Sequence, residues 1–162
     1  MIKNIYLAGG CFWGVEGYFQ QLKGVVKTRV GYSNGKTQVT NYKKIKKTDH
    51  AEVIYLEYDN ELISLNDILR HYFRIIDPVS INKQGPDVGR QYRTGIYYID
   101  EETKNEAEKY IAELQNNFSE KIAVEVEEVA NYIDAEEYHQ KYLDKNPNGY
   151  CHIDLSLAKK SL

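Results

Sequence analysis

The chain has 162 residues, of which 42% are hydrophobic and 28% are charged, a composition typical of an ordinary globular protein. This length suits one domain spanning residues 1–162 and is enough for a substantial core. A net charge of -3 gives no general attraction to nucleic acid or anionic membrane, and no apolar run approaches the roughly 18 residues of a membrane span.

The first predicted strand, residues 4–8, leads through two glycines to Cys11. Apolar side chains then recur at spacings of three and four, which predicts a helix over residues 12–23 that stops at Gly24. Cys11 would therefore lie at a helix start, where free N–H groups and the positive end of the helix dipole favour a thiolate. We expect a lowered thiol pKa and a nucleophilic sulfur; the alternative is a buried structural cysteine.

Two large rings, Phe12 and Trp13, follow this cysteine directly. A reactive thiol in aromatic surroundings suits a small electrophilic substrate that is apolar at one end. The same rings could also be ordinary core residues, so they support a binding site without establishing one.

The next segments alternate between strands and polar connections. Residues 25–31 predict a strand that ends at the turn signal Asn34-Gly35. Residues 36–52 are polar and irregular, and their grouped lysines could contact phosphate, although a solvent-exposed loop is the simpler interpretation. A strand over 53–58 follows. A helix then begins at the N-cap Ser64, with Asp67 as its capping partner, and ends at Asp77-Pro78.

The second half contains a long loop, 77–93, of the kind that is often functional. A strand over 94–99, a helix opening at Glu101, an alternating strand over 122–129 and a helix over 134–143 follow. Residues 144–162 predict an extended tail with a short helix at its end. Hairpins mixed with crossover helices favour an α+β, two-layer domain with a mixed sheet.

Four stretches, in order along nearly the whole chain, resemble the peptide methionine sulfoxide reductase A family. They are Gly10-Cys11-Phe12-Trp13-Gly14, His50-Ala51-Glu52, the run from Gln84 to Arg93, and the run from Ala135 to Tyr142. The resemblance implies an α/β plait with a ferredoxin-like core and a long irregular C-terminal segment. It also implies reduction of the S epimer of methionine sulfoxide, free or in proteins, as a repair and oxidative-stress function.

The resemblance assigns roles in the chemical step to a cysteine, a glutamate and two tyrosines. Cys11 would attack the sulfoxide sulfur, and Glu52 would be the catalytic acid, since a carboxyl group in an apolar pocket keeps its proton. Taken alone, a Glu before a strand is usually exposed. Tyr42 and Tyr92 would be neutral donors to the sulfoxide oxygen. Asp49 stands where the family commonly has Gly, and the segment between Tyr42 and Glu52 is shorter than usual, so we expect an altered loop there.

Substrate binding falls to other positions of the same motifs. Phe12 and Trp13 would hold the substrate methyl group, a fit worth about 1–3 kcal/mol. Asp87 would lie at the rim and bind the substrate's backbone amide. His139, in Tyr-His-Gln, would shape the pocket.

Cys151 is the only other cysteine and lies in the tail. Attack by Cys11 would leave a sulfenic acid, which condenses readily with a thiol. The resemblance implies a Cys11–Cys151 disulfide that thioredoxin reduces by thiol–disulfide exchange, with dithiothreitol as a substitute and no metal or cofactor. We expect a monomer, and a cytoplasmic one since no signal peptide precedes the first strand, either free-standing or fused to an R-epimer reductase.

Three other functions remain open from the residues alone. A metal site could use two cysteines and three histidines, although no Cys-x-x-Cys or His-x-x-x-His spacing supports it; its ligands would come from Cys11, Cys151, His50, His139 and His152. A thiol peroxidase would also pass through a sulfenic acid. A redox switch or peptide-binding module would bind methionine without turnover.

Overall fold

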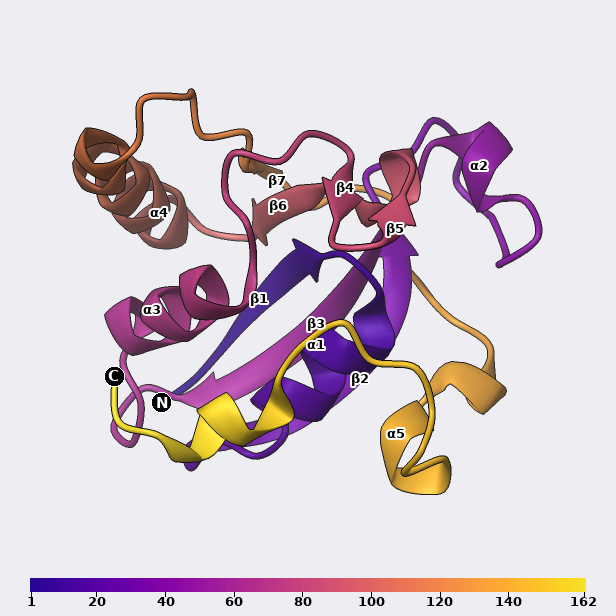
Figure 1. Cartoon of the computed structure of the whole chain (residues 1–162), viewed down its shortest axis with the longest axis horizontal. Helices are drawn as coiled ribbons and strands as arrows, with labels where there is room; N and C mark the ends of the chain where they lie inside the picture. Colours follow the sequence, from indigo (N-terminus) through magenta and orange to yellow (C-terminus); the bar gives the residue numbers. More distant parts are fainter.

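One six-stranded sheet organises the computed structural model, which describes residues 1–162 (Figure 1). Its strands are β1 (Ile2–Gly9), β2 (Val25–Ser33), β3 (Ala51–Asp59), β6 (Thr94–Tyr98), β7 (Glu125–Glu128) and β8 (Ile133–Asp134). They lie in the order β7-β6-β1-β3-β2-β8. The pair β6 and β7 is parallel, and the other neighbours are antiparallel.

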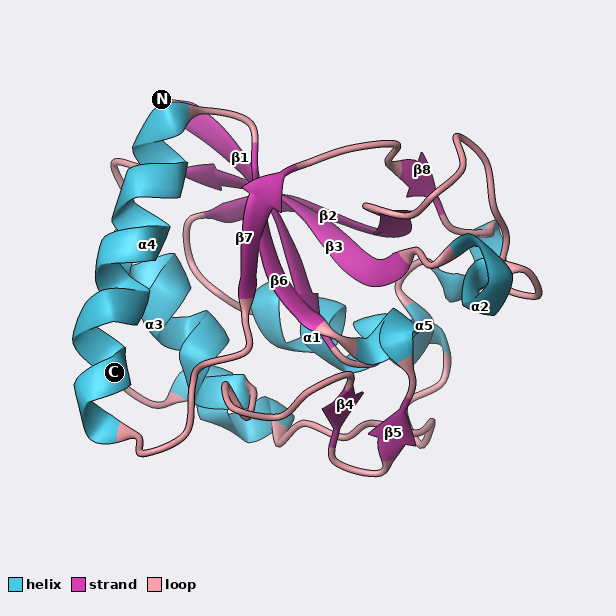
Figure 2. Ribbon diagram, turned by 90° about the horizontal axis from the view of Figure 1, so that it is seen from above, coloured by secondary structure: helices cyan, strands magenta, loops and turns pink.

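Three helices cover one face of this sheet. They are α1 (Phe12–Phe19), α3 (Leu65–Ile75) and α4 (Glu101–Leu114), of which α3 and α4 lie side by side (Figure 2). The elements β1-α1-β2-β3-α3-β6 form the β-α-β-β-α-β unit of a ferredoxin-like plait, with strand order β6-β1-β3-β2. The predicted two-layer α+β fold with a mixed sheet is therefore confirmed.

Alternation along the strands separates two clusters of apolar side chains. On β1, Ile5 and Leu7 belong to a core of 24 buried residues shared with the helices, whereas Ala8 belongs to a small cluster on the opposite face. There the rings of Tyr6 and Tyr132 pack with their centroids 4.9 Å apart. This period of two is expected of a sheet whose helices cover a single face.

Most predicted elements are found, with shifted ends. The Oγ of Ser64 accepts the Asp67 N–H at 3.0 Å, and α3 ends before Asp77-Pro78 as predicted. Helix α1 ends at Phe19 instead of residue 23, and the chain reaches β2 through turns and Gly24, which has a φ of +99°. The N-cap of α4 is Asp100, which the sequence analysis did not identify.

Two segments predicted as loops contain short elements. Residues 36–52 hold α2 (Ile45–Thr48), and β3 already begins at Ala51, so Glu52 lies inside a strand. The long loop 77–93 folds into the hairpin of β4 (Lys83–Gln84) and β5 (Asp87–Val88), followed by the 3-10 turn Arg90–Tyr92. The strand predicted over 122–129 is shorter and is β7.

The helix predicted over 134–143 is wrong. This segment comprises β8, the 3-10 turn Glu137–His139 and the single turn α5 (Tyr142–Lys145). The Gln140 side chain accepts the N–H of Val30 at 2.9 Å and donates to its C=O at 2.8 Å. Lys141 has a φ of +52°, and its N–H donates to Glu16 at 2.8 Å. These hydrogen bonds to distant parts of the chain outweigh the helical spacing of the apolar residues, because intrinsic helix propensity is weak compared with tertiary interactions.

The tail, residues 144–162, passes over α1 and ends near α3 (Figure 1). It is extended as predicted, with the 3-10 turn Leu155–Lys159 near its end. The Arg74 guanidinium of α3 donates to the carbonyls of Leu157, Lys160 and Ser161. No helix of the chain combines the length and the apolar character that crossing a membrane requires.

Candidate active site

The candidate site lies at the end of the sheet where β1 and β2 finish and β3 begins. Cys11 is the N-cap of α1 and is only 8% exposed. Gly10 before it has a φ of +87°, and a Cβ there would lie 2.8 Å from the Cβ of Gln84. Glycine is therefore required for the turn that brings Cys11 from β1 onto the helix start.

A cavity of about 230 Å³ opens beside this cysteine. Seven of the nine predicted site residues line it, namely Cys11, Phe12, Trp13, Tyr42, Glu52, Asp87 and Tyr92. Tyr150 also lines it and was not predicted. The cavity thus gathers side chains from α1, β3, the loop before α2, the β4–β5 region and the tail.

Glu52, the second residue of β3, is 2% exposed. Its Oε1 accepts the N–H of Phe12 at 3.1 Å, which joins the carboxyl group to the first turn of α1. Burial raises the pKa of Glu52 to about 8, against the lowering effect of that hydrogen bond. The carboxyl group therefore carries its proton at neutral pH and can act as a general acid.

The pKa of Cys11 differs from the sequence expectation. Burial raises the pKa of this thiol above its ordinary value, and the negative charge of Glu52 raises it further, while the backbone N–H of Trp13 lowers it only in part. The predicted lowering is thus wrong for the resting site, because desolvation outweighs the helix N-terminus. Protonation of Glu52 removes one charge that opposes the thiolate.

Tyr42 and Tyr92 supply hydroxyl groups on the cavity wall. Burial and the nearby Glu52 charge raise the pKa of both phenols. Both therefore stay neutral and can donate hydrogen bonds to an oxygen atom in the cavity. Tyr42 is 42% exposed, and its backbone N–H donates to Glu136 at 3.1 Å.

His139 lies behind the cavity instead of lining it. Its Nδ1 accepts the indole N–H of Trp13 at 3.0 Å, and burial lowers the pKa of the imidazole. A neutral imidazole is the form whose Nδ1 can accept this bond. Trp13 also stacks on Tyr142, with the ring centroids 3.7 Å apart. His139 thus fixes the orientation of the indole that the cavity uses.

Cys151 does not line the cavity but lies against α1, the helix that Cys11 caps. A Cβ at Gly14 would be 3.1 Å from the Cys151 Sγ, so the tail passes directly over the first turn of α1. The next residue, His152, binds the carbonyl of Gly9 through its Nε2 at 3.0 Å. Both cysteines are free thiols in this state.

Tyr150 closes the cavity from the tail side, where its hydroxyl donates to Asp87 at 2.7 Å. This bond links the tail to the β4–β5 hairpin. The only sequence signal for Tyr150 is its position before Cys151, which does not distinguish it among 15 tyrosines.

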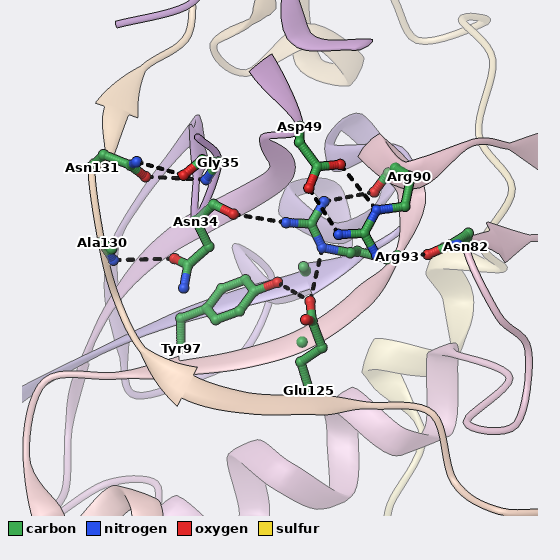
Figure 3. A network of polar contacts seen from close by, with 12 residues as sticks. Asn34, Gly35, Asp49, Asn82, Arg90, Arg93, Tyr97, Glu125, Ala130 and Asn131 are labelled. Atoms are coloured by element: carbon green, nitrogen blue, oxygen red, sulfur yellow. Dashed lines mark hydrogen bonds and ion pairs between the residues drawn. The ribbon is translucent and has the colours of Figure 1, made fainter. Parts of the chain in front are cut away.

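A buried arginine supports the loop that carries Tyr92. Arg93 is 4% exposed and donates to Glu125, to the carbonyl of Asn34 and to that of Arg90 at 2.8–2.9 Å (Figure 3). Arg90 pairs with Asp49 at 2.9 Å. The network joins this loop to the ends of β2 and β7 and to the segment before β3. The position where Asp49 departs from the family pattern is therefore tied to the site loop by an ion pair.

The alternative of a metal site receives no structural support. No group of three His, Cys, Asp or Glu side chains lies where it could hold a metal ion. His50, one of the proposed ligands, instead bonds Thr48 at 2.8 Å through its Nδ1.

Comparisons with known proteins show which family this chain resembles. Residues 3–162 match the family described as peptide methionine sulfoxide reductase. Peptide methionine sulfoxide reductase MsrA of Ureaplasma urealyticum serovar 10 is 51% identical over 162 residues, which cover 99% of this chain and 98% of the relative.

Solved structures are also similar. Reduced Mxr1 from Saccharomyces cerevisiae has a TM-score of 0.87 and 41% identity, covering 93% of this chain and 88% of its own. Methionine sulfoxide reductase A of Corynebacterium diphtheriae has a TM-score of 0.83 and 32% identity, covering 93% and 77%. Mxr1 has also been solved in complex with Trx2, and that structure matches with a TM-score of 0.63 and 31% identity over 87% of this chain and 84% of its own.

Proposed function

Because the chain belongs to the peptide methionine sulfoxide reductase family, we propose that it reduces the S epimer of methionine sulfoxide, free or in proteins, to methionine. One observation carries this proposal: the Cys11 sulfur and a carboxyl group with a pKa near 8 line a single small cavity. The choice of epimer rests on the family, and the proposed biological role is repair of oxidised methionine under oxidative stress.

In the first step, the Cys11 sulfur attacks the sulfoxide sulfur while Glu52 gives its proton to the sulfoxide oxygen. The new bond between the two sulfur atoms then breaks, and its electron pair binds the hydroxyl group to Cys11, which becomes a sulfenic acid. Methionine leaves with the electron pair of the broken S–O bond. The proton lost by the Cys11 thiol restores Glu52. Tyr42 and Tyr92 donate to the oxygen, and such positioned donors stabilise charge that develops there.

Substrate orientation falls to the remaining cavity residues. Phe12 and Trp13 enclose the methyl end of the substrate, with His139 holding the indole in place. Asp87 lies at the mouth, where a carboxylate can accept the backbone N–H of a substrate.

Recycling uses the tail. The Cys151 thiol attacks the Cys11 sulfenic acid, a disulfide forms, and water leaves with the hydroxyl group and the thiol proton. Thioredoxin, or dithiothreitol in the test tube, then reduces the disulfide by exchange. The contact of Cys151 with the α1 turn and the Mxr1–Trx2 complex support this part of the proposal.

The remaining expectations form part of the same proposal. Residues 1–162 would be one domain, since the sheet takes strands from both halves of the chain. The protein would act as a cytoplasmic monomer that needs no metal or prosthetic cofactor. Gel filtration, cell fractionation and metal analysis test these points.

The decisive experiment is chiral. A mixture of both methionine sulfoxide epimers is incubated with the protein and dithiothreitol. The sulfoxide that remains is then separated into its two epimers. We expect the S epimer alone to disappear, and Cys11→Ser to abolish its loss. Persistence of both epimers would contradict the proposal, and hydrogen peroxide would then be the next substrate to test.

The Cys151→Ser variant tests recycling. It should complete one turnover and then stall with thioredoxin as the reductant. An unchanged steady-state rate would show that Cys151 is not the resolving cysteine.

A further inference from the structure

A second, larger cavity adjoins the candidate active site. Its volume is about 470 Å³, and Tyr42, Asp87 and Tyr92 line both cavities. The two spaces therefore form one groove, with Cys11 at the inner end. We name the outer part, between α2 and the β4–β5 hairpin, the lysine groove, because Lys43 and Lys46 lie on its wall. Figure 1 shows α2 and this hairpin beyond the end of the sheet.

The lysine groove lies in the most basic segment of the chain. Lysines occupy five positions between Gly35 and Thr48, and no Asp or Glu does, although the chain as a whole has more acidic than basic residues. These lysines are Lys36, Lys43, Lys44, Lys46 and Lys47. The positive charge is thus concentrated beside the site.

Some charged side chains at this groove have an ion-pair partner, and others have none. No ion pair engages the Lys43 or Lys46 ammonium groups, whereas the nearby Arg90 is paired with Asp49 at 2.9 Å. Asp87, at the junction of the cavities, already accepts the Tyr150 hydroxyl at 2.7 Å. Two lysines without an ion pair therefore line the outer part of the groove, and the Asp87 carboxylate lies at its junction with the inner part.

We propose that the lysine groove binds the polypeptide flanking an oxidised methionine and favours substrates with Asp or Glu near that methionine. This inference rests on the proposed function and adds a preference among its protein substrates. A methionine sulfoxide side chain needs only the inner cavity, so the chain that carries it must leave across the junction residues. An acidic side chain on that segment then reaches Lys43 and Lys46, while its backbone passes Asp87.

The test compares peptides of one length with a central methionine sulfoxide and Glu, Gln or Lys two and three residues to either side. Each kcat/KM with dithiothreitol is divided by that of the same protein on free methionine sulfoxide. We expect the Glu peptides to exceed the Gln peptides by about three- to tenfold, since exposed ion pairs contribute modestly. The Lys peptides should be the poorest, and 0.5 M salt should remove most of the difference.

Variants locate the preference. Lys43→Gln/Lys46→Gln should bring the Glu and Gln peptides to equal efficiency, and Lys43→Glu/Lys46→Glu should favour the Lys peptides. Lys109→Gln/Lys121→Gln is the matched control, because it makes the same charge change at exposed positions in and after α4, and it should keep the wild-type ratio.

Each outcome separates this inference from the proposed function. If the wild-type protein shows no activity toward free methionine sulfoxide, the proposed function itself is wrong. Normal reduction of the free substrate with equal efficiency on all peptides would overturn the groove alone. The groove inference also fails if the lysine variants slow only the thioredoxin-driven reaction, because the lysines would then serve the reductant.

Discussion

At the scale of single residues, the site depends on a carboxyl group that is almost fully buried in the wall of the cavity. Glu52 faces the helices from β3 and bonds the Phe12 N–H beside Cys11. Burial holds its pKa at about 8, well above the 4.5 of a free carboxyl group, so the group that donates the proton also lowers the free energy of unfolding as pH rises between these two values. Activity and stability should therefore respond to pH in linked ways.

The chemical step should lose rate as pH rises through about 8, because Glu52 then no longer carries the proton that the sulfoxide oxygen needs. Glu52→Gln should slow methionine formation about 100-fold or more at pH 7 and remove this alkaline fall. Single-turnover kinetics from pH 6 to 9.5 measure both effects. Glu57→Gln, on the opposite face of the same strand, is the control. A glutamine variant that kept the alkaline fall would assign it to another group.

Stability should also fall as pH rises, but over a lower pH window than activity. The pKa of Glu52 rises from 4.5 in the unfolded chain to about 8 when folded, so between these values the folded state binds the extra proton. The free energy of unfolding must then fall as pH rises through this window. Glu52→Gln should gain at least about 1 kcal/mol over the wild type between pH 5 and 8, since one pKa unit is worth about 1.4 kcal/mol. Urea unfolding at both pH values measures the gain, and an equal difference at both would contradict it.

Gly14 is the residue that permits the tail to approach α1. A Cβ at this position would lie 3.1 Å from the Cys151 Sγ and 3.3 Å from the His152 Nδ1. Gly14→Ala should displace Cys151 and slow disulfide formation by about tenfold, since misplacing reacting groups by 1 Å can cost about 100-fold. The first turnover should survive.

Trapping of the Cys11 sulfenic acid after a single turnover measures this delay. Gly17→Ala is the matched control, because its Cβ would meet Leu143 and Leu155 in place of Cys151. Equal rates of disulfide formation in the wild type and Gly14→Ala would show that the contact does not position the thiol.

At the scale of elements, sequence patterns predict those helices and strands that nearby residues stabilise. Helix α3 follows from its apolar spacing and the Ser64 cap, both visible within a dozen residues. The segment 134–143 has a comparable spacing but a different structure, because Gln140 bonds Val30, which lies 110 positions earlier in the chain. The same limit applies to the site. Motifs identify Cys11 and Glu52, whereas Tyr150 joins the cavity only through the path of the tail.

We therefore expect the Gln140 side chain to stabilise the fold through its hydrogen bonds to Val30 rather than to belong to a helix. Gln140→Leu would leave the buried N–H and C=O of Val30 without partners and should cost about 2–4 kcal/mol, since each such group costs about 1–3 kcal/mol. Gln20→Leu is the control, because its side chain bonds Asp144 at the surface and should change stability by less than about 0.5 kcal/mol. Urea unfolding measures the free energy of unfolding of both variants. Equal losses of stability would show that the hydrogen bonds to Val30 do not stabilise the fold more than a surface bond does.

At the scale of the whole molecule, the proposed cycle needs a tail that is positioned yet able to move. The sheet and its three helices share one core, and the tail joins this core through Ile153 and through Leu155, which packs against it. Beyond Cys151, its last turn is fixed by Arg74 of α3. A tail held at both sides of the cysteine keeps the local concentration of the thiol high near Cys11, and release of one end should lower it.

Arg74→Met tests this view, since it removes the hydrogen bonds to the carbonyls of Leu157, Lys160 and Ser161 but keeps an apolar stem. Hydrogen exchange should accelerate in residues 155–161 and stay unchanged in β1 and β3, because local opening does not require global unfolding. Disulfide formation after one turnover should slow, while the first methionine is released at the wild-type rate. Arg70→Met, one turn earlier on α3 with only an exposed partner in Asp67, is the control. If both variants exchange alike in the tail, the anchor lies elsewhere, and the apolar contacts of Ile153 and Leu155 with the core must hold the thiol in place.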